Sequence, residues 1–71
     1  MMNYFHSNFK FLLEKKNIVL STLAKNISVT RQAINEYKNG KYPNYDNLIK
    51  IAEYLDVSID ILLKTDLSSE E

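Results

Sequence analysis

Apolar side chains recur at helical spacing along this chain, and that period limits what it can fold into more than any other feature. The clearest case is Phe5, Phe9, Leu12 and Leu13, which follow the i, i+4, i+7, i+8 pattern of an amphipathic helix over residues 4–16. One glycine and one proline leave few tight turns, so the sequence favours helices over a meander of strands. We therefore expect an all-α fold, a compact bundle of about five short helices.

Four further helices are predicted from shorter repeats and from residues that start or stop a helix. The second covers residues 20–27, and the third, residues 31–38, follows Thr30, whose hydroxyl can accept an early backbone N–H. Asn39-Gly40 ends the third helix, because glycine adopts a left-handed backbone at low cost. The fourth and fifth helices follow the expected caps Asn44 and Ser58. Their inward residues are Leu48, Ile51, Ala52, Leu55, Ile59, Leu62 and Leu63.

The length of 71 residues leaves room for one domain, which we place at residues 1–65, with 66–71 as an acidic tail or the start of a linker. The absence of cysteine excludes disulfides and thiolate metal sites. No apolar run approaches the roughly 20 residues of a membrane span, and the start lacks a signal-peptide pattern. These features predict a cytoplasmic protein.

Charge is distributed unevenly along a chain whose formal net charge is zero. Residues 1–45 carry seven basic and two acidic side chains, a net +5, whereas residues 46–71 carry two basic and seven acidic ones, a net −5. A basic half can meet phosphates while an acidic half stays in solvent. The distribution favours a nucleic-acid partner, although a merely solvated surface would also contain charges of both signs.

The second and third predicted helices are joined by only about three residues, too few for an antiparallel hairpin, so they must cross steeply. Ala24 offers a small side chain where the two backbones approach. Val29, Ile34 and Tyr37 offer apolar contacts from the turn and the third helix. This constellation predicts a helix-turn-helix formed by the second and third helices.

The third helix presents a polar face opposite its apolar one, formed by Arg31, Gln32, Asn35 and Glu36. The major groove of DNA admits a helix, and its base edges match such side chains. Arginine pairs with guanine, glutamine or asparagine with adenine, and a glutamate accepts from cytosine. We predict that these four residues contact bases of double-stranded DNA, because the N-terminal end of this helix enters the groove.

The joint spacing of residues between 18 and 63 resembles the phage lambda repressor and Cro (XRE) family of helix-turn-helix proteins. The matching positions are Leu23, Ala24, Val29, Thr30, Ile34, Tyr37, Asn39, Gly40, Pro43, Leu48, Ile51, Ala52, Leu55, Val57, Ser58, Leu62 and Leu63. The resemblance implies a sequence-specific transcriptional regulator, a repressor that binds a pseudo-palindromic operator as a homodimer. The resemblance places Thr30, Asn39, Gly40 and Lys41 at the DNA backbone, and Ser21 and Tyr42 are predicted to add contacts there.

Two departures from the family pattern concern the helix-turn-helix itself. The family usually opens its second helix with a capping Ser, Thr or Asn followed by Gln, whereas this chain has Val19 and Leu20. Fewer phosphate contacts are therefore expected there, and Ser21 is expected to serve as a later cap. Ser28 stands where the turn usually has glycine, at a cost of about 1 kcal/mol for a left-handed backbone.

Two further departures lie elsewhere in the pattern. Lys38 and Leu13 occupy positions where the family often has a buried Glu–Arg pair, and we expect apolar packing to replace that pair at little net cost. Asp56 stands where the family often has glycine.

Other functions have weaker support in the sequence. His6, the only histidine, is expected at the surface without an acid-base partner, so an enzyme is not predicted. No metal-ligand spacing, phosphate loop or small-molecule pocket is implied, and no cofactor is expected. The main alternative is a protein-interaction module of the same fold, which would serve as an antitoxin, an antirepressor or a repressor's partner. The candidate dimer surface consists of Ile59, Ile61, Leu63 and Leu67.

Overall fold

The computed structural model describes residues 3–70 and is built from helices. Its elements are α1 (Phe5–Lys15), α2 (Leu20–Asn26), α3 (Arg31–Lys38), α4 (Tyr45–Leu55), α5 (Ile59–Lys64) and a 3-10 helix, η1 (Leu67–Glu70). The predicted all-α fold with five α-helices is confirmed, and each predicted helix lies within a residue or two of its expected position.

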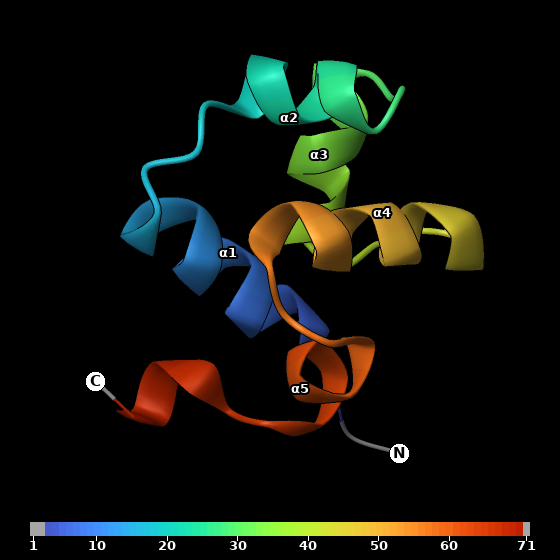
Figure 1. Ribbon diagram of the computed structural model, residues 1–71. Coiled ribbons are helices and arrows are strands. Elements are labelled where there is room, and N and C mark those ends of the chain that lie inside the picture. The colour runs from blue at the N-terminus through green and yellow to red at the C-terminus, as the bar shows by residue number, and fades with distance from the viewer. Residues whose placement is uncertain (1–2, 71) are drawn as a thin grey trace.

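Helix α1 is the central element of the fold. It contacts α3 on one side and α5 and η1 on the other, while α4 contacts α5. In Figure 1, α2 and α3 lie at one end of the molecule and α5 and η1 at the opposite end, with α1 and α4 between them. The arrangement leaves the α2–α3 pair at an end of the molecule, where it can meet a large partner.

The core is formed by apolar residues from all five α-helices. Phe5 and Phe9 stack with ring centroids 5.4 Å apart and are fully buried. The remaining buried apolar residues are Leu12, Leu13, Leu23, Ala24, Ile27, Ile34, Tyr37, Ile51, Ala52, Leu55 and Leu62. The periodic positions in the sequence therefore face inward, because burying this stripe is what stabilises helices as short as these.

Side-chain caps begin three of the helices at the predicted residues. The hydroxyl of Thr30 accepts from the Ala33 N–H at 3.0 Å, and Asn44 and Ser58 do the same for α4 and α5. Helix α2 differs, because its N-cap is Val19 and no side chain caps it. The expectation that Ser21 would act as a later cap is wrong, since α2 begins at Leu20 and includes Ser21.

Left-handed backbone occurs in the turns between the α-helices. Asn17, Ser28 and Asp56 have φ of 52°, 60° and 60°, and Gly40 has φ of 119°. The departures at positions 28 and 56 therefore place non-glycine residues in the conformation that glycine adopts most cheaply.

A buried asparagine, which the sequence analysis did not single out, holds the C-terminal end of the fold. Asn8 donates to the carbonyls of Leu62 and Thr65 at 2.8 and 2.6 Å, and its Oδ1 accepts from the Leu67 N–H at 3.0 Å. Leu67 itself packs against the core. The folded unit thus continues past residue 66, where we expected the tail to begin; residues 1, 2 and 71 lie outside the described range.

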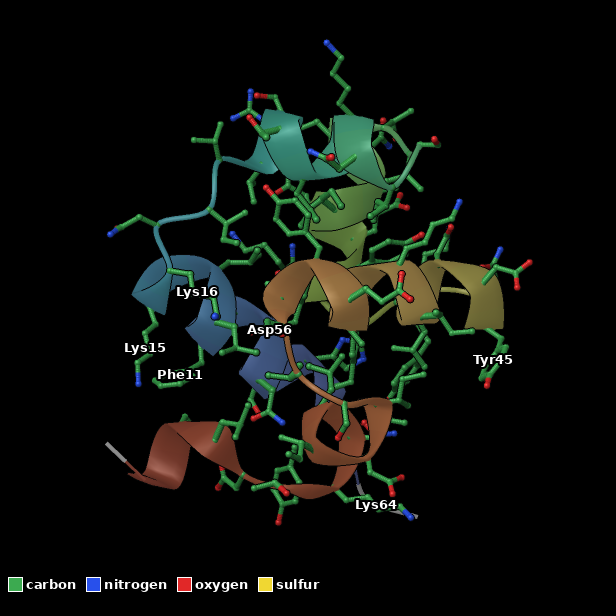
Figure 2. All side chains as sticks on the ribbon, viewed as in Figure 1. Phe11, Lys15, Lys16, Tyr45, Asp56 and Lys64 are labelled. Atoms are coloured by element: carbon green, nitrogen blue, oxygen red, sulfur yellow. The ribbon has the colours of Figure 1, made fainter. Side chains whose placement is uncertain are left out.

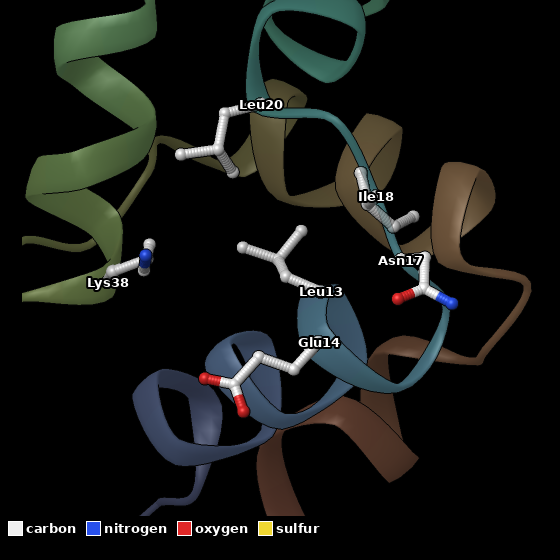
Figure 3. Close-up of a pocket in the computed structure, with 6 residues that line it drawn as sticks. All are labelled: Leu13, Glu14, Asn17, Ile18, Leu20 and Lys38. Atoms are coloured by element: carbon white, nitrogen blue, oxygen red, sulfur yellow. The ribbon is translucent and has the colours of Figure 1, made fainter.

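Leu13 and Lys38 both line an open hollow between α1, α2 and α3 (Figure 3). The hollow has a volume of about 490 Å³ and is also lined by Glu14, Asn17, Ile18 and Leu20. Leu13 is buried and Lys38 is half-buried. Among the described helices, none is long and apolar enough to cross a bilayer.

Candidate nucleic-acid interface

Helices α2 and α3 form a helix-turn-helix with a tightly bonded turn. The N–H of Val29 donates to the Ala24 carbonyl at 2.9 Å, and Ser28 provides the left-handed residue that reverses the chain. Ala24 is buried on α2, which packs against α3, and a larger side chain at this position would overfill the core. Figure 1 shows α3 running away from α2 instead of lying alongside it.

The polar face of α3 has the exposure required to read a partner. Ile34 and Tyr37 are buried and fix the rotation of the helix, so that Arg31, Gln32 and Asn35 are exposed. Thr30 is also exposed at the start of α3, where its hydroxyl holds the first turn. Ser21 is exposed on α2. These predicted contact residues are therefore presented together by one pair of helices.

Glu36, the fourth residue of that face, is half-buried and engaged within the protein. Its carboxylate lies 3.3 Å from the ammonium of Lys41, and its backbone carbonyl accepts from the Lys41 N–H at 3.0 Å. Two residues predicted as DNA contacts thus bind each other. The pairing reduces the repulsion that an isolated carboxylate would exert on phosphates.

The loop that follows α3, residues 39–42, is tied back to the helix. Asn39 donates from Nδ2 to the Asn35 carbonyl at 2.8 Å, and the Lys41–Glu36 contacts close the turn. Gly40 has φ of 119°, and no heavy atom lies near the place where a side chain would begin. The glycine is therefore required by its backbone conformation, and the space beside it lets another molecule approach the main chain.

The start of α1 also contacts this loop, which sequence reasoning missed. His6 is half-buried, not at the surface as expected, and its Nδ1 lies 2.8 Å from the Tyr37 carbonyl. Its ring centroid lies 4.3 Å from that of Tyr42, whose hydroxyl donates to Asn3 at 3.2 Å. No local sequence pattern predicts these contacts, because they join residues more than 30 positions apart.

Charge around the candidate interface is mainly positive. Lys25 on α2, Arg31 on α3 and Lys41 in the loop are all exposed, whereas Asp60 on α5 lies at the opposite end of the molecule (Figure 1). Lys15 lies over the ring of Phe11 at the end of α1, 5.4 Å from its centroid (Figure 2). Within residues 3–70, no group of three potential metal-ligating side chains gathers.

Comparison with known proteins identifies the family. Residues 9–62 match the model of the helix-turn-helix family, and the chain belongs to that family, of the XRE type. It is 38% identical over 61 residues to the uncharacterized HTH-type transcriptional regulator YqaE of Bacillus subtilis (strain 168), a match that covers 84% of this chain and 53% of that protein. Proteins of this class are transcriptional regulators and not enzymes.

A second relative is the HTH-type transcriptional activator BcrR of Enterococcus faecalis, 37% identical over 60 residues, covering 83% of this chain and 29% of that protein. The chain thus spans about half or less of the length of these relatives. Among solved structures, a transcriptional regulator from Listeria innocua superposes with a TM-score of 0.82 at 25% identity, over 99% of this chain and 72% of the other.

Proposed function

We propose that this protein is a sequence-specific DNA-binding regulator that inserts α3 into the major groove. The observation that carries the proposal is the exposure of Arg31, Gln32 and Asn35 on the outer face of α3, whose opposite face is locked into the core. Arginine and the two amides supply the bidentate hydrogen bonds that distinguish guanine and adenine. Glu36 completes the base-reading face, and its pairing with Lys41 orients it.

Backbone contacts come from the residues that flank this face. Ser21 is exposed on α2, and Thr30 is exposed in the turn between α2 and α3. The loop after α3 consists of Asn39, Gly40, Lys41 and Tyr42. These contacts set the register of α3 on the duplex, while the bases set the sequence that is bound.

The regulator acts as a dimer on a pseudo-palindromic operator, with half-sites about one helical turn apart. One module of this size has too little surface for high affinity, and twofold symmetry is the usual remedy. Of the four residues expected at the dimer surface, Ile59, Leu63 and Leu67 are partly buried against the core. Ile61 is 43% exposed and is the member of that set available to a second copy.

In vitro selection from a random duplex library at about 0.1 M salt tests the base-reading role. The protein should enrich an inverted repeat, and the double variant Arg31→Ala/Gln32→Ala should lose it. The matched control is Lys50→Ala/Glu53→Ala, which removes two exposed side chains from α4. Enrichment of the same site by the Arg31→Ala/Gln32→Ala variant would refute the role of α3.

We propose repression as the outcome of binding, through occlusion of RNA polymerase. A reporter whose promoter overlaps the selected site should fall in expression when the protein is present. A rise in expression would instead show that this protein activates the promoter, which is the role given in the name of the relative from Enterococcus faecalis.

A protein-interaction role is the second candidate, and the apolar start of α2 favours it. Val19 is 61% exposed, and the half-buried Leu20 lines the hollow shown in Figure 3. Polar residues that contact phosphate usually occupy these positions in the family. If selection enriches no site and a pull-down with the native protein recovers a partner that Val19→Ser no longer binds, this second role replaces the first.

A further inference from the structure

We propose that His6 is a positioning residue that holds the loop 39–42 in the conformation that meets the DNA backbone. The inference rests on the proposed DNA-binding function and extends it to α1, which carries none of the residues assigned to the interface. It is drawn from one hydrogen bond and one ring contact that join the start of α1 to the end of α3.

The hydrogen bond ends on a carbonyl that needs a partner. The last carbonyls of a helix lack the N–H four residues onward, and here the Lys41 N–H donates to Glu36 instead of Tyr37. His6 Nδ1 lies 2.8 Å from the Tyr37 oxygen. Because a carbonyl can only accept, Nδ1 carries the hydrogen and donates it. The side chain of His6 therefore takes the place of a backbone donor at the end of α3.

The ring contact extends this restraint from the helix into the loop. The centroid of the imidazole lies 4.3 Å from the ring centroid of Tyr42 and 5.1 Å from that of Phe5, which is fully buried. The Tyr42 hydroxyl donates to the Oδ1 of Asn3, which also accepts from the Phe5 N–H at 3.1 Å. The loop is thus held at Tyr42 from α1 and at Lys41 from α3, and Gly40 immediately precedes these two restrained residues.

A single hydrogen bond, from Nδ1, sets the orientation of the His6 ring. Nε2 of His6 is buried and has no hydrogen-bond partner among the described residues. A side chain that reproduces only the Nδ1 donor should therefore preserve the restraint on the Tyr37 carbonyl, while the ring contact with Tyr42 is lost. Asparagine does so, because its Nδ2 has nearly the position of Nδ1, whereas phenylalanine keeps the ring and removes the donor.

A loop restrained in advance should bind DNA more tightly, because less conformational freedom is lost in the complex. His6→Phe should weaken binding to the selected operator about tenfold and make the slope of log affinity against log salt shallower by about 1, the value of one phosphate contact. His6→Asn keeps the donor and loses the ring contact, so it should weaken binding less than His6→Phe does, by about threefold. Ser7→Ala, a change at the adjacent exposed residue, should bind within about twofold of the native protein.

Amide NMR spectra of the free proteins separate positioning from folding. His6→Phe should shift or broaden the signals of Gly40 and Lys41 and leave those of α4 and α5 in place, while His6→Asn should change the signals of Gly40 and Lys41 less. Native affinity and slope in His6→Phe would overturn the proposal, as would equal losses in His6→Phe and His6→Asn. Failure of the native protein to bind any duplex would overturn the proposed function and the positioning role together, whereas native-like binding by His6→Phe overturns only the latter.

Discussion

Asn8 illustrates how one residue can determine where the fold ends. Its amide holds two carbonyls at the end of α5 and one N–H of η1, and it is fully buried. Asn8→Ala leaves these buried groups unpaired, so the free energy of unfolding should fall by about 2–3 kcal/mol in urea denaturation. Ser7→Ala, at an exposed neighbouring position, should change it by less than about 0.5 kcal/mol. Equal stability of the two variants would contradict the role of Asn8.

Ser28 carries a conformational cost that a single substitution should relieve. Its φ of 60° is unfavourable for an L residue, and its side chain is exposed. Ser28→Gly should raise the midpoint of thermal unfolding, with a gain of about 0.5–1 kcal/mol. Ser21→Gly, inside α2, should lower it by about the same amount. A destabilised Ser28→Gly would show that the serine side chain contributes more than its backbone costs.

Residues with local roles could be predicted from the sequence, and those with distant partners could not. Thr30, Asn44 and Ser58 cap helices three residues away, so the signal lies within one turn. Asn8 bonds to residues 54–59 positions away, and His6 to one 31 positions away. A polar residue on the apolar face of α1 was the available sign for Asn8, yet its partner is set by tertiary packing.

At the scale of elements, α2 starts without a side-chain cap. Val19 has the extended backbone of an N-cap, φ −80° and ψ 122°, but its side chain cannot accept a hydrogen bond. Val19→Ser should therefore stabilise the protein by about 0.5–1 kcal/mol, measured by chemical denaturation. Val19→Ala removes the same exposed methyl groups and adds no acceptor, so it serves as the control. If Val19→Ser and Val19→Ala change the stability equally, the missing cap at position 19 does not weaken α2.

Helix limits followed closely from the sequence because periodicity and caps agree over each stretch. The exception is η1, since residues 66–71 read as a polar tail with a single leucine. Leu67 packs against the core, and Asn8 fixes its N–H. One apolar residue has no periodicity, so a short 3-10 helix of this kind leaves no sequence signal to detect.

At the scale of the whole molecule, the charge asymmetry should determine the salt dependence of binding. Lys41 and Lys64 each form an exposed ion pair, with Glu36 and Asp60, but only Lys41 belongs to the candidate interface. Lys41→Ala should weaken binding to every duplex and reduce the salt slope by about 1, as measured by fluorescence anisotropy. Lys64→Ala should leave both quantities unchanged. Equal effects would place the phosphate contacts elsewhere.

The dimer model concerns the molecule as a whole and depends on the exposed residue of α5. Ile61→Asp should abolish cooperative binding of two copies to the inverted repeat while preserving affinity for a single half-site, because Ile61 lies apart from α3 and is exposed. Gel shifts on one and two half-sites measure both. Cooperative binding by the variant would exclude α5 from the dimer surface.

The central claim is that α3 reads bases, and a specificity matrix tests it most directly. The affinities of the native protein and of Arg31→Ala would be measured for the selected operator and for every single base-pair change in one half-site. We predict that Arg31→Ala loses about 1–3 kcal/mol of discrimination at one base pair and retains it at the others. A uniform loss across all sequences would make Arg31 a phosphate contact and contradict the account.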